Sequence, residues 1–153
     1  MECSLNKIYE YIDSLNVMVI STIDYDTKYS RATPVFFARR DNLFYFVSFE
    51  ETHHSRNIAE NNYICASITQ NYQNYREIRG AQIFGLCRKL SSLYESARAA
   101  SVYFSKFLDF KAFLDPQLMK SAINVSWYEF YGERVIYTDN TIEFGYREKL
   151  ELF

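Results

Sequence analysis

The chain has 153 residues, 48% hydrophobic and 24% charged, which fits a single domain over residues 1–153 that is able to bury a core. Its net charge of −2, with no clustered Lys/Arg face, argues against a nucleic-acid partner. No apolar run approaches the roughly 18 residues that span a bilayer, so no membrane partner is expected. Three cysteines, an odd count without metal-like spacing, favour reduced thiols and a cytoplasmic location.

The first third of the chain predicts one helix followed by three strands. Apolar residues at helical spacing, beginning with Leu5, predict a helix that ends near Asn16. Residues 17–24 then begin the sheet. Arg31 to Arg39 and Leu43 to Ser48 are rich in Val, Phe and Tyr and flank a short polar turn, so they predict two further strands.

The following segments continue the sheet and add helices. Tyr63 to Thr69 and Ile78 to Lys89 predict strands on either side of a polar loop. Ser92 and Glu95 match a capping box that opens a helix, and Asp115-Pro116 is a second helix-start signal.

The end of the chain predicts two closing strands, Trp127 to Tyr131 and Val135 to Thr138, separated at Gly132. An aromatic stripe at helical spacing precedes them and indicates a helix face that packs in the core. Its members are Tyr103, Phe107, Phe110 and Phe113.

Polar side chains gather where the strand ending at Ser48 leads into a predicted helix that Thr52 is able to cap. The first N–H groups of a helix are unpaired and the dipole is positive there, so this end favours a phosphate or a carboxylate. Glu50 and Glu51 would repel a phosphate unless they face away, and a merely solvated polar loop is the alternative. The other donors within the segment are Ser55, His53, His54 and Arg56.

Sequence patterns for metal binding and for several enzyme classes are missing. Adjacent histidines on a helix point about 100° apart, so His53 and His54 predict no metal site. Gly80 to Gly85 imitates the start of a P-loop, but Leu86 and Cys87 stand where Lys and Ser or Thr are needed. No catalytic residue is assigned, and any reactive atom is expected to come from a cofactor.

The order of several segments resembles a known family. The segments RATPVFF, LFYFVS, THHSRNI, YICASIT and RGAQIFGLCRKL are similar to the pyridoxamine-phosphate-oxidase-like FMN-binding split barrels. The closing WYEFYGERVIYTDNTIEFG resembles the YhbP-like branch of uncharacterised bacterial proteins, and the likeness runs from about Val17 to Gly145. It implies a mainly β fold, a Greek-key split barrel of about six to seven strands with three to four flanking helices. It also implies FMN as the cofactor and a homodimer with the cofactor near the interface.

The resemblance also assigns site residues. Arg31, Thr33, Pro34 and Val35 match strand residues that line the isoalloxazine ring, and Ser48 matches the hydroxyl residue that closes the next strand. Thr52, His53 and His54 fall where the family often has Ser or Thr followed by Arg and Lys, which hold the FMN phosphate. Arg79 stands where the later strand approaches the flavin, while Gly80 replaces a flavin-contacting side chain of the oxidase proper.

Two functional hypotheses follow from these residues. The first is an FMN-binding protein that acts as a flavin-dependent oxidoreductase on an unknown substrate. Histidines in place of Arg and Lys are expected to hold a dianion less firmly, because imidazole is only partly charged at neutral pH. The second is a non-catalytic barrel that binds flavin or another planar cofactor as a sensor or store, or whose pocket has lost its ligand. In this class His53 or His54 would be able to bind haem.

Overall fold

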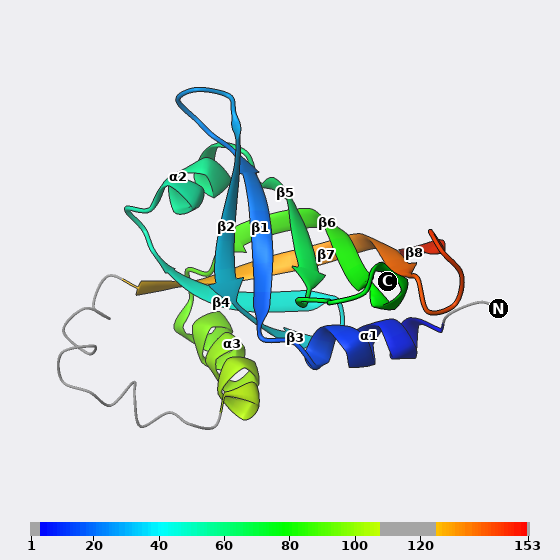
Figure 1. Cartoon of the computed structure of the whole chain (residues 1–153). Coiled ribbons are helices and arrows are strands. Elements are labelled where there is room, and N and C mark those ends of the chain that lie inside the picture. Colours follow the sequence, from blue (N-terminus) through cyan, green and yellow to red (C-terminus); the bar gives the residue numbers. More distant parts are fainter. Residues whose placement is uncertain (1–3, 108–124, 153) are drawn as a thin grey trace.

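The computed structural model describes residues 4–107 and 125–152, and it is dominated by one antiparallel sheet (Figure 1). The sheet follows the order β2-β1-β5-β6-β7-β4-β3, with β8 paired to β7. Its strands are β1 (Val17–Ile23), β2 (Ser30–Phe36), β3 (Ala38–Arg40), β4 (Leu43–Phe49), β5 (Tyr63–Thr69), β6 (Arg79–Lys89), β7 (Val125–Asp139) and β8 (Arg147–Glu151). The helices are α1 (Leu5–Asp13), α2 (His53–Glu60) and α3 (Leu93–Lys106), with a 3-10 turn η1 (Tyr75–Glu77).

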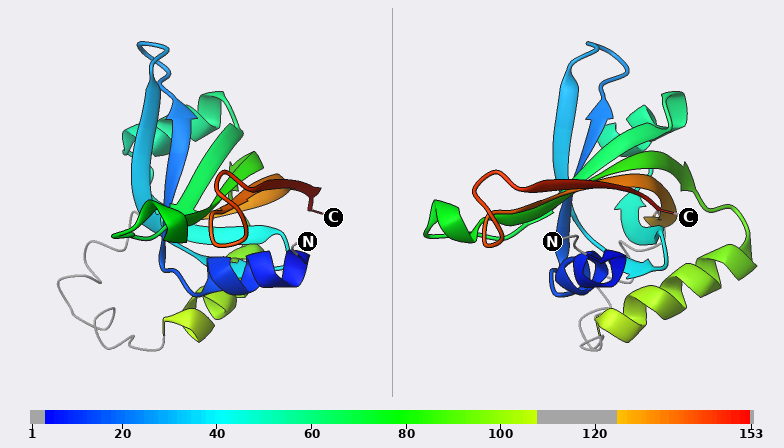
Figure 2. Two further views of the ribbon diagram at one scale, coloured as in Figure 1. Left: turned by 45° about the vertical axis from the view of Figure 1, so that its right-hand side comes forward. Right: turned by 90° about the vertical axis from the view of Figure 1, so that its right-hand side faces the viewer.

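The sheet curls because its two end strands are joined by a single residue. Phe37 connects β2 to β3; its side chain is fully buried and its backbone N–H donates to Asn16 O at 3.0 Å. β2 nevertheless pairs only with β1, and β4 pairs with β3 and β7, among the described strands. The barrel is therefore split between β2 and β4. Figure 2 shows the curled sheet in two turned views.

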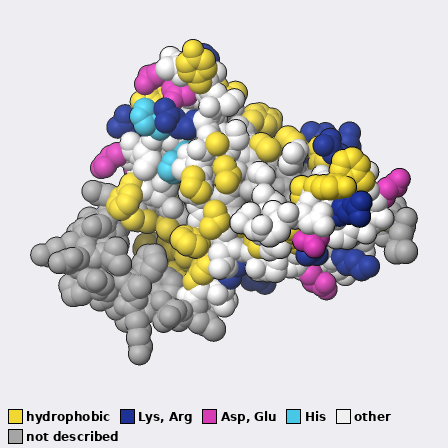
Figure 3. Space-filling model, viewed as in Figure 1, with side chains coloured by type: hydrophobic (Ala, Val, Ile, Leu, Met, Phe, Trp, Pro, Cys, Tyr) yellow, Lys and Arg dark blue, Asp and Glu magenta, His cyan; other side chains and the backbone are white. Residues whose placement is uncertain are grey.

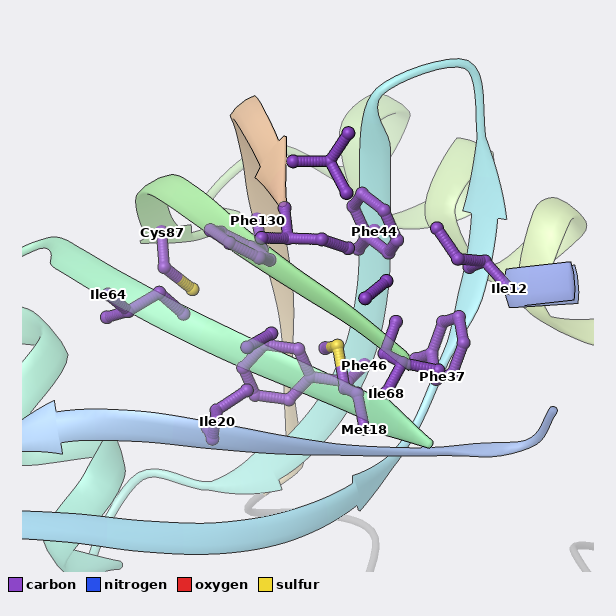
Figure 4. Packing of buried hydrophobic residues seen from close by; sticks show 14 of the residues in the cluster. Ile12, Met18, Ile20, Phe37, Phe44, Phe46, Ile64, Ile68, Cys87 and Phe130 are labelled. Carbon is purple, nitrogen blue, oxygen red and sulfur yellow. The ribbon is translucent and has the colours of Figure 1, made fainter. Parts of the chain in front are cut away.

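The core lies inside this curled sheet, where alternate residues of each strand point inward. In β1, for example, Met18 and Ile20 are buried while Val17 and Val19 are exposed. α1 covers one end of the core through Ile8 and Ile12, which are one helical turn apart. Figure 4 shows Ile12, Met18 and Ile20 packing among the phenyl rings of two strands, β4 and β7, and of the β2–β3 junction. These rings belong to Phe37, Phe44, Phe46 and Phe130.

The structure confirms the mainly β split-barrel fold and most of the predicted elements. α3 begins as predicted, since the Ser92 hydroxyl accepts from the Glu95 backbone N–H at 3.1 Å. Among the described residues the three α-helices agree with the predicted three to four, and the eight strands include β8, which was not predicted. The helix-start signal at Asp115-Pro116, and Phe110 and Phe113 of the aromatic stripe, lie outside the described residues. In the part of the chain that is described, no helix has the length and apolar character needed to cross a membrane.

Two strand predictions were wrong in their boundaries. The single strand predicted over Arg31 to Arg39 is broken at Phe37, because the chain there leaves one end of the sheet and joins the other. The two closing strands are in fact one strand, β7. Gly132 does not form a turn; a Cβ there would lie 2.9 Å from Ile83 Cγ2, so this glycine allows a close approach within the core.

Gly85, on the neighbouring strand β6, also allows two backbone segments to come close together. The register between β6 and β7 shifts between Phe84 and Gly85, where the ladder contains a bulge. A Cβ on Gly85 would stand 1.9 Å from the carbonyl oxygen of Tyr131, which is backbone and has no room to move aside. At Gly80 of the same strand, the nearest atoms would lie at an ordinary 3.5 Å.

We therefore expect Gly85→Ala to lower the free energy of unfolding by at least about 1–3 kcal/mol, because the added methyl group forces the two strands apart. Urea unfolding followed by circular dichroism measures the change. Gly80→Ala is the matched control and should change stability by less than about 1 kcal/mol. Equal losses in the two variants would contradict the assignment of the steric constraint to Gly85.

Candidate functional site

The N-terminus of α2 is held by a small hydroxyl network. Thr52 caps the helix in an extended backbone conformation, and its Oγ1 accepts from the Ser55 backbone N–H at 3.3 Å. The same oxygen lies 2.9 Å from Phe49 O and 3.2 Å from Ser48 Oγ. The predicted cap is therefore present, and it ties the helix end to the last residues of β4.

His54 belongs to this network rather than to the solvent. Its Nε2 lies 2.6 Å from Ser48 Oγ and 3.3 Å from Thr52 Oγ1, and the residue is 9% exposed. Burial lowers the pKa of His54 below its ordinary value of 6.5. The imidazole is thus neutral at neutral pH, and it contributes a hydrogen-bonding edge instead of the positive charge of a Lys in this position.

His53 points to a different cluster on the outside of the barrel. Its Nδ1 lies 3.9 Å from Asp24 Oδ2, and its ring stacks on Tyr25 with 6.1 Å between ring centres. Arg31 donates to the same Asp24 oxygen from Nε at 3.0 Å and from a terminal nitrogen at 2.7 Å. The charge of Arg31 is therefore balanced by Asp24. Figure 3 shows the histidines beside Lys or Arg side chains at this end of the molecule.

A cavity of about 310 Å³ lies at the split between β2 and β4. Five of the nine predicted site residues line it, namely Pro34, Val35, Ser48, Thr52 and His54. They come from three separate elements, so the fold brings them together from distant parts of the sequence. Arg31, Thr33 and His53 lie on the neighbouring parts of β2 and α2 and are not among the lining residues.

The rest of the cavity wall is apolar and was missed by sequence reasoning. It is formed by Phe36, Val47, Phe49, Tyr103 and Val125. Phe36 and Phe49 sit beside predicted site residues on their own strands, and that adjacency was the available signal. Tyr103 was assigned to the core by helical spacing; its residue is 5% exposed, and it also closes one side of the cavity.

The cavity wall carries no ionised side chain among the residues that line it. Glu50, which had counted against an anion, is turned elsewhere: it accepts from Ser126 Oγ at 2.6 Å and pairs with Lys89 Nζ at 2.9 Å. These contacts lower the pKa of Glu50, which keeps its charge directed at Lys89. The polar end of the cavity is thus made of two hydroxyls, a neutral imidazole and the end of α2.

These groups fit a planar ring with a polar tail, because flat apolar walls suit the ring and the helix N-terminus suits an anion. Two arginines near α2 already have partners. Arg31 is bound to Asp24, and Arg56 donates to the Tyr25 hydroxyl at 3.3 Å. The chain therefore offers a phosphate less positive charge than an Arg and Lys pair would.

Arg79 lies apart from the other predicted site residues. It lines a separate cavity between α1 and the first residues of β6, together with Tyr11 and Asp139. No residue lines both cavities. Within one chain, Arg79 and the residues near α2 do not form one site.

No cluster of three or more His, Cys, Asp or Glu side chains is placed to hold a metal ion in the described ranges.

Comparisons with known proteins agree with this fold. No family model matches the chain, and no curated protein matches it in sequence. Solved structures do match. A haem-binding protein from Mycobacterium smegmatis has a TM-score of 0.75 at 14% identity, over 99% of this chain. The chain has the split-barrel fold.

Two further solved structures extend the comparison. A Clostridium acetobutylicum protein of the pyridoxinephosphate oxidase family, related to general stress protein 26 of B. subtilis, has a TM-score of 0.67 at 14% identity. That match covers 97% of this chain and 94% of that protein. A FAD-binding protein from Mesorhizobium loti has a TM-score of 0.67 at 13% identity, over 87% of this chain and 92% of that one. The split-barrel neighbours thus include flavin-binding and haem-binding proteins, which supports the resemblance at the level of the fold.

The chain spans 59% of the length of the mycobacterial haem-binding protein.

The Arg31–Asp24 pair makes a pH-dependent contribution to stability. Hydrogen bonds, first of all from Arg31, lower the pKa of Asp24 from 3.8 to about 2. A carboxyl whose pKa is lowered by folding stabilises the fold above its ordinary pKa and loses that effect as pH falls toward the lowered value.

We expect Arg31→Gln to be less stable than the wild type at neutral pH, with a difference that shrinks as pH falls from about 4 toward 2. Urea midpoints measured across this range test the pattern. Arg40→Gln, at an exposed position at the end of β3, is the control and should show no such convergence. A constant difference at every pH would contradict the proposed role of Arg31.

Proposed function

We propose that the chain binds FMN in the cavity at the split between β2 and β4. Pro34 and Val35 would contact the isoalloxazine ring, with Arg31 and Thr33 on the same strand. Ser48, Thr52 and His54 would supply hydrogen bonds at the polar end, beside His53. Arg79, which lines the separate cavity beside α1, is left out of the proposed site.

The observation that carries the proposal is the convergence of Pro34, Val35, Ser48, Thr52 and His54 on one cavity. These residues were assigned by family resemblance from separate segments, and nothing in their sequence spacing requires them to meet. The cavity volume of about 310 Å³ lies at the lower end of the roughly 300–1,000 Å³ of small-molecule sites. A cofactor of the size of FMN would thus extend beyond the walls that one chain provides.

A homodimer would supply the missing walls. The outer face of β1 and β2 exposes Val17, Val19, Pro34 and Phe36, which we call the β1–β2 patch. Val17 is opposite Phe36 and Val19 is opposite Pro34, so the four residues are contiguous. Pro34 and Phe36 also line the cavity. Contiguous exposed apolar surface of this kind favours an interface, and here it borders the proposed cofactor site. Figure 3 shows hydrophobic side chains exposed over this face of the molecule.

We further propose a flavin-dependent oxidoreductase located in the cytoplasm. Bound flavin would supply the hydride or electron transfer, while the protein supplies binding and polarity. The neutral His54 imidazole and the Ser48 hydroxyl would accept or donate hydrogen bonds there without adding charge. Cys65 and Cys87 are both free thiols, which accords with a reducing compartment.

Titration of the purified chain with FMN tests the binding proposal. We expect about one flavin per chain, followed by the visible absorption spectrum. Ser48→Ala and the double variant Thr52→Ala/His54→Ala should weaken binding roughly tenfold or more, because each removes hydrogen bonds from the polar end. Ser101→Ala, an exposed serine of α3 outside the cavity, is the control. A wild-type chain that takes up no FMN would refute the proposal.

The same preparation separates the enzyme from its alternative. Reduction of the bound flavin by NADH or NADPH would support the oxidoreductase. A flavin that stays oxidised with every donor would favour a sensor or store, and a Soret band after addition of haemin would favour haem. His54 is a poor axial ligand as it stands, because its Nε2 is engaged by Ser48.

We expect Val19→Asp to shift the protein from dimer to monomer in analytical ultracentrifugation and to weaken FMN binding, because the charge disrupts the β1–β2 patch. Leu93→Asp places the same charge on a 92% exposed apolar residue of α3 and should change neither. A wild-type chain that is monomeric at all concentrations would contradict the dimer, and FMN binding by the Val19→Asp monomer would contradict an interfacial cofactor.

A further inference from the structure

A second cavity, of about 550 Å³, lies on the side of the barrel covered by α1. Its walls come from α1, from the start of β6 and from the end of β7 with the turn that follows. It shares no lining residue with the cavity at the β2–β4 split. Its volume is many times the roughly 30 Å³ that one water molecule occupies, and it falls in the range of small-molecule sites.

Arg79 lines this cavity, and one of its donors has no partner. Its Nε is buried and has no hydrogen-bond partner among the described residues. The guanidinium is placed by Tyr11, whose ring centre is 5.2 Å from Arg79 Cζ and whose hydroxyl donates to the Arg79 carbonyl at 2.7 Å. Buried polar groups nearly always find a partner, so the Arg79 side chain retains hydrogen-bonding capacity for an acceptor in the cavity.

The nearest acid does not fill this role. Asp139 is directly opposite Arg79 in the β6–β7 ladder, and the residue is 8% exposed. Its Oδ1 accepts from the backbone N–H of Thr141 at 3.0 Å and from Thr141 Oγ1 at 2.6 Å. Its Oδ2 lies 3.4 Å from the Tyr137 hydroxyl. A carboxylate offers about four acceptor positions, so Asp139 retains capacity for a further donor while leaving Arg79 Nε unbonded.

The charges around the cavity are balanced. α1 contributes Lys7 and Glu10, and the sheet contributes Arg79 and Asp139, which gives two cations and two anions. Two carboxylates disfavour a phosphate dianion, and two cations disfavour a simple amine. A ligand that carries one charge of each sign matches both.

We propose that this cavity binds a small zwitterion with the carboxylate and ammonium pair of an α-amino acid. The carboxylate pairs with the Arg79 guanidinium, and the ammonium faces Asp139 and Glu10. This site is independent of the proposed FMN site, since the two share no residue of one chain.

Thermal melting and calorimetric titration of the full chain with each of the twenty common L-amino acids test the inference. We expect at least one to raise the melting temperature and to bind once per chain. Acetate, which has the carboxylate alone, should bind at least about tenfold more weakly, because it leaves the acids unpaired. Inorganic phosphate should not bind. A chain that binds no amino acid, or that binds phosphate equally well, would overturn the proposal.

Variants locate the site. Arg79→Gln should lower the affinity for the amino acid roughly tenfold to a hundredfold, which is the effect of losing one charge-assisted hydrogen bond. Arg79→Lys keeps the charge but lacks the planar guanidinium, so it should also weaken amino-acid binding. Arg76→Gln, an exposed arginine of η1 outside the cavity lining, is the matched control and should leave binding unchanged. An equal loss in Arg76→Gln would overturn the inference.

The FMN titration distinguishes this proposal from the first. The Arg79→Gln variant should bind FMN to the same extent as the wild type. If the wild type binds no FMN, the variant should bind none either. A loss of FMN binding in Arg79→Gln would overturn the zwitterion site, because it would assign Arg79 to the flavin. Loss of FMN binding in Ser48→Ala alone would leave the zwitterion site standing.

Discussion

The split between β2 and β4 is the constraint on which the rest of this structure depends. Phe37 carries the chain directly from one end of the sheet to the other, and its burial fixes the junction. Because the strands that it brings together do not pair, their side chains line a space instead of a ladder. Pro34 to Phe36 on one side and Val47 to Phe49 on the other become the walls of the candidate cofactor cavity.

The electrostatics of that cavity follow from where the nearby charges are already bound. Asp24 binds Arg31, and Lys89 binds Glu50. The positive charge of Arg31 and the negative charge of Glu50 are therefore partly neutralised and act only weakly on an anion in the cavity. Burial keeps His54 neutral, and its Nε2 forms a hydrogen bond with Ser48 Oγ. The site that results is a hydrogen-bonding one at the end of a helix. A cofactor held in this way relies more on ring contacts and on the helix end than on ion pairing.

The two cavities give the barrel two different chemical environments. The cavity at the split is apolar with a polar end and no ionised wall residue, which suits a flat ring. The cavity beside α1 holds two charges of each sign and a buried donor without a partner, which suits a small charged molecule. The family resemblance had placed Arg79 with the flavin, on a later strand of the barrel. The sheet order separates them, since Arg79 begins β6 next to Asp139 at the end of β7.

The sequence by itself determined the mainly β fold, the cap at Thr52 and the start of α3 at Ser92, because these depend on local pattern and on side chains a few residues apart. It also singled out the segments around Pro34, Ser48 and Thr52. Only the tertiary structure decided that Gly132 continues a strand, that His54 is buried and neutral while His53 faces Asp24, and that Arg79 lies elsewhere. Those outcomes depend on which strands pair and which side chains they bury, and such long-range contacts leave no trace in local spacing.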